Sequence, residues 1–488
     1  MSAELALIAL LAAPVAQALL TMAFARPPGL RDVVFIGFAI AIAGLAIYLV
    51  DAVGNGATAR VVLARPLPNV DLAFALEPLG VLMAALIAIL GAPHAVHAAG
   101  IVRATHEKAP ARLMAFLALA MASALAVAFS ANLFSFFVAY QALILTTFPL
   151  IAHRGDEDAR VAGRVYLATL LAGAIGLLLP AMVWTYAIAG ALDFQAGGVL
   201  AGRVDPITAS ALLVLFVFGL GMASMPPMHR WMPAASLAPN PAFVSTHALT
   251  VLPAGGVGLL KVIALVFGPA MADARIAAQA LMVLAGIAMC VTALIALSKQ
   301  DIRERLSYSC LTQLLAVALG ALLATPVGLF AATLQIVALC CAAATLTMAA
   351  GAVFAATGRT GTADYAGLGR VMPWTFAGFA LASASMIGLP PFSGAWAKLW
   401  LITAASHAQF PWAAALAALA AVLTFAHLGP LAANALAARA PTDAFKRPDG
   451  ASILLAAPVI LSAAATLWLL VLADPLASFL APIWTPAS

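Results

Sequence analysis

The sequence predicts an all-α membrane protein that crosses the lipid bilayer many times. Of its 488 residues, 65% are hydrophobic and only 8% are charged, and the mean hydropathy is +1.09. Because soluble domains carry about 25% charged residues, this composition excludes a soluble protein. Apolar stretches of about 20 residues, the length at which a helix spans a bilayer, recur from one end of the chain to the other.

Fourteen apolar stretches are long enough to be membrane spans. They lie near residues 3–25, 33–50, 77–99, 110–129, 132–152, 161–189, 207–226, 242–269, 276–297, 308–324, 327–357, 372–405, 411–437 and 451–473. The first has no basic leader and no small-residue cleavage site, so we expect a retained helix and not a signal peptide. Residues 51–75 alternate weakly between apolar and polar residues and predict a short hairpin outside the membrane.

The basic residues predict how the chain is oriented in the membrane. If the loops are assigned alternately to the two sides, 17 of the 23 basic residues fall on one side and 4 on the other. The remaining two, Lys261 and Lys398, lie within apolar stretches. Since basic residues accumulate in cytoplasmic loops, we expect both termini in the periplasm of a bacterial cell with the chain in its inner membrane. The net charge of +5 follows from these loops, and no nucleic-acid partner is expected.

Two pairs of prolines divide the interior of the chain. Pro226 and Pro227 interrupt the seventh span, and Pro390 and Pro391 interrupt the twelfth. The breaks correspond if spans 4–8 and 9–13 are two inverted five-helix repeats, residues 109–270 and 271–440. Residues 1–108 then add three N-terminal helices and residues 441–488 a C-terminal helix to a single membrane domain. Broken helices at membrane depth indicate a transport path or its remnant, and a simple kink in a packed helix is the alternative.

Residues 221–261 identify the family that the chain resembles. They read GMASMPPMHRWMPAASLAPNPAFVSTHALTVLPAGGVGLLK. This segment resembles the antiporter-like membrane subunits L, M and N of respiratory complex I and the D subunit of the Mrp-type cation/proton antiporters, whose pattern is roughly GxxKxxxxPxHxWLPxAxxAPTPVSxxxHxxxxVKAGxxxLL. The positions that agree are His229, Trp231, Pro233, Ala238, Pro239, Pro241, His247, Ala254 and Gly255. The similarity runs from about residue 75 to 430, and it implies the fourteen-span fold with two repeats.

The charged residues that the resemblance leads us to expect are replaced in this sequence. Gln141 stands where the family has a glutamate in the fifth span, and Met222 and Pro253 stand at two lysine positions. Leu339 and Ala343 occupy the histidine and lysine of an H-x-x-x-K pattern in the eleventh span. An amide does not titrate as a carboxyl does, so Gln141 is an interhelical polar contact or a water ligand. Loss of charge across the set indicates that a continuous proton relay was given up.

A few ionisable side chains remain as proton-path candidates. Lys398 matches the family's basic residue after the second break, and because a lysine in mid-membrane costs about 2.5–3.5 kcal/mol, it should face a cavity or a neighbouring subunit unless it snorkels. Lys261, at the far end of the eighth span, is expected to snorkel. His247 and His427 are the buried groups that titrate near neutral pH, although hydrogen-bonded core histidines are commoner. Pro253 should kink the eighth span.

No cofactor and no metal site is predicted. The four cysteines lie in or beside apolar stretches without a CxxC spacing, so we expect packing residues, and there is no glycine-rich phosphate loop. Asp301 with Arg303 or Arg305 is expected to form an interfacial ion network. The chain has no catalytic site of its own, but it could belong to an ion-translocating oxidoreductase complex.

The leading hypothesis is a subunit of a multisubunit cation/proton translocating complex whose own central proton path is reduced or lost. It would act as a structural partner or as a half-channel through Lys398, beside other antiporter-like and small membrane subunits in the bilayer. A second hypothesis is a non-transporting anchor in a redox-driven or inorganic-carbon-accumulating complex. A third is a stand-alone secondary carrier, which the sparse set of polar residues disfavours.

Overall fold

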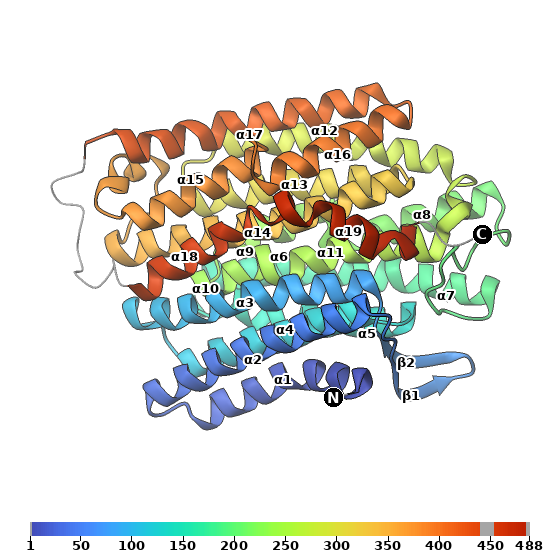
Figure 1. Ribbon diagram of the computed structural model, residues 1–488, viewed down its shortest axis with the longest axis horizontal. Helices are drawn as coiled ribbons and strands as arrows, with labels where there is room; N and C mark the ends of the chain where they lie inside the picture. Colours follow the sequence, from blue (N-terminus) through green and yellow to red (C-terminus); the bar gives the residue numbers. More distant parts are fainter. Residues whose placement is uncertain (1, 440–452, 485–488) are drawn as a thin grey trace.

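The computed structural model describes residues 2–439 and 453–484 as one bundle of long, nearly parallel helices (Figure 1). Two basic residues that contribute to the predicted orientation, Lys446 and Arg447, lie outside the described residues. Over the described part, eleven helices are long and apolar enough to cross a membrane, or twelve if one bent pair is counted as a single span. The predicted class, an all-α polytopic membrane protein, is therefore confirmed.

The N-terminal part packs two exposed helices and a hairpin beside a buried helix. Its elements are α1 (Ala3–Ala23), α2 (Pro28–Gly54), β1 (Arg60–Leu67), β2 (Val70–Ala75) and α3 (Pro78–Ala104). The predicted hairpin is confirmed: β1 and β2 pair antiparallel from Arg60 opposite Ala75 to Leu67 opposite Val70. It projects from the end of the bundle at which α1 begins (Figure 1). Both α2 and α3 have a proline in their first turn. Proline is tolerated there because the N–H that it lacks would make no hydrogen bond within the helix.

The next helices surround the first broken span. They are α4 (Pro110–Phe129), α5 (Leu133–Ile151), α6 (Glu157–Gly173), α7 (Leu179–Ala189), α8 (Pro206–Gly219), α9 (Trp231–Ala235), α10 (Asn240–Val244) and α11 (Val251–Lys261). A π-helical turn, Ala174–Leu178, joins α6 to α7. The helical stretch from Asn240 to Met271 is buried along its whole apolar window, so it forms the centre of the bundle.

The remaining helices complete the bundle around a second buried helix. They are α12 (Arg275–Ser298), α13 (Ile302–Leu322), α14 (Pro326–Thr357), α15 (Pro373–Ile387), α16 (Ser393–His407), α17 (Pro411–Ala437), α18 (Ile453–Ala465) and α19 (Trp468–Trp484). α14 is buried over nearly its whole length, while α1, α2 and α17 expose much of their apolar surface. Helices that expose apolar side chains in this way suit contact with lipid or with another membrane subunit.

Both predicted helix breaks are confirmed, and the eighth span is interrupted as well. α8 ends at Gly219, ahead of Pro226 and Pro227. The break around Pro390 and Pro391 separates α15 from α16. A π-helical turn, Ser245–Leu249, is followed by a non-helical Thr250, and Pro253 lies in the first turn of α11. The kink therefore lies just ahead of Pro253, because a proline within the first turn of a helix is tolerated.

Asp301 caps a helix and forms no direct ion pair with Arg303 or Arg305 in the described structure. The Asp301 carboxylate caps α13 by accepting hydrogen bonds from the backbone N–H groups of Arg303 and Glu304. The guanidinium groups of Arg303 and Arg305 donate instead to backbone carbonyls, and within the described residues neither forms an ion pair with Asp301. The ion pair in this loop joins Lys299 and Glu304 at 2.8 Å, and its hydrogen bond holds the pKa of Lys299 above the usual value.

Candidate functional site

The positions that carry charge in the resembled family form a dry centre in this protein. Met222, Leu339 and Ala343 are at most 2% exposed, and Pro253 is buried in α11. α11 packs directly on the segment before the first break, since a Cβ at Gly255 would collide with the backbone carbonyl group of Met222. Only a glycine permits so close an approach of the two backbones.

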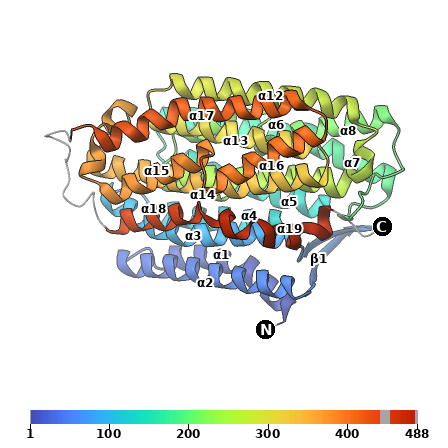
Figure 2. The ribbon, with the colours of Figure 1, turned by 45° about the horizontal axis from the view of Figure 1, so that its top comes forward.

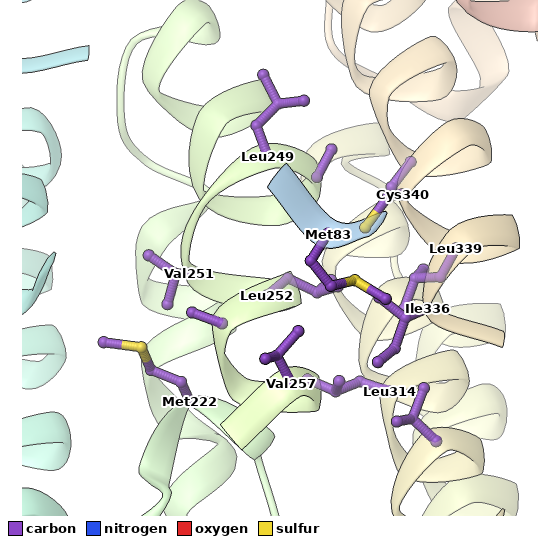
Figure 3. Packing of buried hydrophobic residues seen from close by; sticks show 14 of the residues in the cluster. Met83, Met222, Leu249, Val251, Leu252, Val257, Leu314, Ile336, Leu339 and Cys340 are labelled. Atoms are coloured by element: carbon purple, nitrogen blue, oxygen red, sulfur yellow. The ribbon is translucent and has the colours of Figure 1, made fainter. Parts of the chain in front are cut away.

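Figure 3 shows how apolar side chains fill this centre. We call the following residues the apolar plug: Met222, Val251, Leu252, Val257, Leu314, Ile336, Leu339 and Cys340. All of them are buried, and they come from the first break and from α11, α13 and α14. A buried water needs two to four polar partners, and the side chains of the plug offer none apart from a thiol. The four cysteines are buried and free, as expected of packing residues.

Gln141 lies on α5 with one polar atom unsatisfied. Its Oε1 atom is buried and has no hydrogen-bond partner in the described part of the chain, so the expected interhelical contact is not formed. Val138 and Leu145, three residues before and four after it, expose 38% and 58% of their surface. The exposed side chains of this face are apolar, so the face suits contact with lipid or with another membrane subunit.

Lys398 is turned into the bundle and held by two acceptors. Its ammonium donates to Oε1 of Gln313 at 3.0 Å and to the carbonyl of Met386 at 2.9 Å. Met386 lies in the last turn of α15, so the second break presents the negative end of a helix dipole to the lysine. The snorkelling alternative is therefore wrong for Lys398.

His427 joins the same polar cluster from α17. Its Nε2 lies 3.1 Å from Oγ of Ser309, four residues before Gln313 on the same face of α13. Gln335 of α14 donates to Oε1 of Gln313 at 3.0 Å. The fold thus brings two sequence-predicted candidates, Lys398 and His427, to one interface of α13. We call Ser309, Gln313, Gln335, Lys398 and His427 the α13 polar cluster.

His247 lies in the interrupted eighth span, on another side of α13. It is fully buried, and its Nε2 lies 3.0 Å from Oγ of Ser307 and 3.2 Å from the carbonyl of Met232. Its Nδ1 lies 3.0 Å from Oγ1 of Thr246. Among the described residues, no hydrogen bond continues from Ser307 to Lys398, so His247 is separate from the α13 polar cluster.

Lys261 forms a buried ion pair, which contradicts the expected snorkelling. The side chain is fully buried, and its ammonium contacts the carboxylate of Glu77 at the start of α3. It also donates to the carbonyl of Ser130 at 2.9 Å and lies 5.1 Å from the centre of the Phe194 ring. This lysine therefore connects the end of α11 with the start of α3 and the end of α4, near the hairpin.

Sequence reasoning missed two buried histidines on α3. His94 and His97 are 4% and 0% exposed, so His247 and His427 are not the sole buried histidines. Nε2 of His94 lies 2.9 Å from the carbonyl of Pro241, and Nε2 of His97 lies 2.9 Å from Oδ1 of Asn240. The signal for them in the sequence is their spacing: two histidines three residues apart within a predicted span fall on one face of the helix.

A small cavity lies beside His94 at the interruption of the eighth span. It has a volume of about 10 Å³ and is lined in part by Gln17, Ser245 and Thr250. Oε1 of Gln17 is buried and lacks a partner in the described structure. A cavity of this size holds about one water molecule, which would satisfy that atom. The polar side chains described above therefore lie around the apolar plug, and none of them lies within it.

Two side chains that can exchange a proton meet at α13, whereas the side chains of the apolar plug include no carboxyl, amine or imidazole. Lys398 and His427 have acceptors and donors within hydrogen-bond distance. The plug separates these groups from Gln141, the candidate of the fifth span, and offers no titratable carboxyl or amine. Among the described residues, no group of three or more His, Cys, Asp or Glu side chains is placed to hold a metal ion.

Comparison with known families gives one match over most of the bundle. The model of the family described as NADH:quinone oxidoreductase/Mrp antiporter, transmembrane, matches residues 130–424. The chain is 28% identical over 333 residues to NADH-quinone oxidoreductase subunit N of Desulforudis audaxviator, covering 67% of this chain and 65% of that protein. It is 25% identical over 277 residues to the D subunit of the Na(+)/H(+) antiporter of Alkalihalophilus pseudofirmus, covering 56% and 55%.

Solved structures share the fold over the whole chain. A chain of the Mrp complex from Dietzia sp. superposes with a TM-score of 0.87 at 23% identity, covering 100% of this chain and 98% of that one. A chain of an archaeal membrane-bound sulfane sulfur reductase gives a TM-score of 0.85 at 20% identity, covering 97% and 96%. The sequence matches to curated relatives extend over less than two thirds of each relative, so these comparisons establish the family and the fold.

Proposed function

Because the chain belongs to the NADH:quinone oxidoreductase/Mrp antiporter membrane family, we propose that it is an antiporter-like subunit of a multisubunit complex that translocates cations and protons. In this subunit the central proton path is reduced or lost. The observation that carries this proposal is the apolar plug, which includes two of the positions where the family has charged residues, Met222 and Leu339. A proton relay needs groups that exchange protons, and no side chain of the plug does so near neutral pH.

The subunit works beside other antiporter-like and small membrane subunits in the bilayer. The face of α5 that carries Val138 and Leu145 supports such a partner, because both apolar side chains are exposed on it. A neighbouring subunit that packs on this face would bury them.

The finer details of the fold belong to the same proposal. Fourteen segments cross a bacterial inner membrane, spans 4–8 and 9–13 form two inverted repeats, and both termini are periplasmic. The parts are residues 1–108, 109–270, 271–440 and 441–488. The two breaks support this division, because each follows a helix of nearly the same length. α8, of 14 residues, precedes the break at Pro226 and Pro227, and α15, of 15 residues, precedes the break at Pro390 and Pro391.

The test is gentle affinity purification of the tagged chain from native membranes, with mass spectrometry of the proteins that remain bound. We expect a paralogue that retains the glutamate and lysines of the family. A variant with Leu145→Ala removes exposed apolar area from the α5 face, and it should recover less of that paralogue. A chain recovered alone and stable would contradict the proposal and favour the stand-alone carrier.

The half-channel is tested by Lys398→Ala in the assembled complex. We expect proton flux to fall by at least about tenfold, because a positioned proton-transfer group typically contributes about a hundredfold or more. Lys299→Ala is the matched control, since Lys299 is a partly exposed lysine in a loop. Flux is measured in vesicles with a pH-sensitive dye, and assembly by the amount of complex recovered. Unchanged flux with normal assembly would exclude the half-channel and leave the role of an anchor.

A further inference from the structure

A groove of about 460 Å³ lies between α2, α3, α14 and α19, and its lining is almost entirely apolar. Its walls include Leu82 and Ile89 of α3, Val337 of α14, and Trp468 and Phe479 of α19. Asp51 of α2 is the one charged residue in the lining. α19 lies beside α3, after the bend that separates it from α18 (Figure 2).

We propose that this groove binds one acyl chain of a phospholipid whose headgroup carries an ammonium, with Asp51 as the partner of that ammonium. The volume lies within the range of about 300–1,000 Å³ that is typical of small-molecule sites. The inference is independent of the proposed function, because it concerns residues outside the plug and the α13 polar cluster.

The depth of the groove matches one leaflet of a bilayer. α3 and α14 both begin at the hairpin end, and Ile89 and Val337 each lie eleven residues beyond the first residue of their helix. At about 1.5 Å per residue, that is about 17 Å. A single leaflet of hydrocarbon is about 15 Å thick, so the groove ends near the middle of the membrane.

Asp51 lies at the level of the headgroups. It is three residues before Gly54, the last residue of α2, and it is exposed. The Asn55 side chain donates to the backbone carbonyl of Asp51, but no hydrogen bond or ion pair to the Asp51 carboxylate is found in the described structure, whose ion pairs at this end involve Glu77, Asp71 and Asp193. A carboxylate above an apolar groove attracts an ammonium and repels an anionic headgroup.

A transmembrane helix from another subunit fits the groove less well. A helix needs about 20 residues, or about 30 Å, to cross the bilayer, whereas the groove covers only the half near the hairpin. A partner helix would also place apolar side chains beside the exposed Asp51 carboxylate, which gains nothing from them. A flexible acyl chain, in contrast, is about as long as one leaflet is thick, so it fills the groove without extending beyond it.

Trp468 provides a fluorescent probe inside the groove. The full chain, purified in detergent from native membranes with the subunits it retains, is titrated with phosphatidylethanolamine or phosphatidylglycerol carrying brominated acyl chains. Bromine quenches indole fluorescence on contact. The fluorescence of Trp468 is obtained by subtracting the fluorescence of the Trp468→Phe variant from that of the parent. We expect saturable quenching with a half-saturation about threefold lower for phosphatidylethanolamine, the effect of one exposed ion pair.

Two variants and one control complete the experiment. Asp51→Asn should abolish the preference between the two lipids, and Ala85→Phe, which fills the groove from α3, should abolish the quenching of Trp468. Asp273→Asn, an exposed aspartate near the end of another helix, should leave both unchanged. Equal half-saturation for the two lipids in the parent would overturn the proposal. The proposal would also be overturned if neither lipid quenched Trp468 in the parent.

Discussion

Replacing Glu77 with glutamine is expected to lower the free energy of unfolding by about 3 kcal/mol. Lys261 is fully buried, and the substitution would leave its ammonium with the Ser130 carbonyl but without a carboxylate. Removing one partner of a buried pair costs about 3–5 kcal/mol, because the remaining charge stays out of water. The lower end applies, since the Glu77 side chain is 23% exposed.

The measurement is denaturant unfolding of the purified chain in detergent. The double variant Glu77→Gln with Lys261→Met should recover most of the loss, because it removes both charges and keeps their volumes. Asp193→Asn is the matched control: it breaks the exposed pair with Arg60 at the same end, and it should cost less than about 1 kcal/mol. Equal stability of Glu77→Gln and the parent would show that this pair does not hold α11 to α3.

Features that depend on a few neighbouring residues could be predicted from the sequence. The hairpin at residues 60–75 follows from a short alternating segment between two spans, and both helix breaks follow from proline pairs. Each of these is set by local backbone geometry, which the sequence records directly. The membrane class follows from composition alone, because apolar surface must be covered by lipid or protein.

Features that depend on distant residues could not be predicted. Snorkelling is the natural expectation for Lys261, because its partner Glu77 lies in another helix and only packing brings the two together. Arginines close in sequence are the natural partners for Asp301, but two backbone N–H groups at the start of α13 are closer and geometrically better placed. A charge pattern along the chain does not reveal which of several acceptors a side chain will reach.

The candidate site could be predicted in part. The resemblance identifies the replaced positions, and the structure adds that Met222 and Leu339 lie in one cluster of buried apolar side chains. The meeting of Lys398 with Gln313 was not predictable, because Gln313 carries no signal of its own. His94 and His97 lie ahead of residues 130–424, which the family model matches, and outside the segment 221–261 that carries the resemblance.

Restoring a family lysine in the plug is expected to destabilise this protein. Met222→Lys should lower the free energy of unfolding by about 3 kcal/mol, the cost of placing a lysine at the centre of a membrane span. Met222 is fully buried, and Gly255 packs so closely on its backbone that the segment has little freedom to move. The labelled neighbours of Met222 in Figure 3, Val251 and Val257, offer no acceptor to an ammonium.

Met222→Leu separates the effect of charge from the effect of shape. A swap between two apolar side chains of similar volume costs less than about 1.5 kcal/mol, so the leucine variant should remain close to the parent. Both variants are unfolded by denaturant in the same detergent, and their midpoints are compared at equal slope. If Met222→Lys were as stable as Met222→Leu, water or a hidden carboxylate would have to reach the plug. The charged residues of the family would then have been replaced without closing the proton path, and the subunit could still conduct protons.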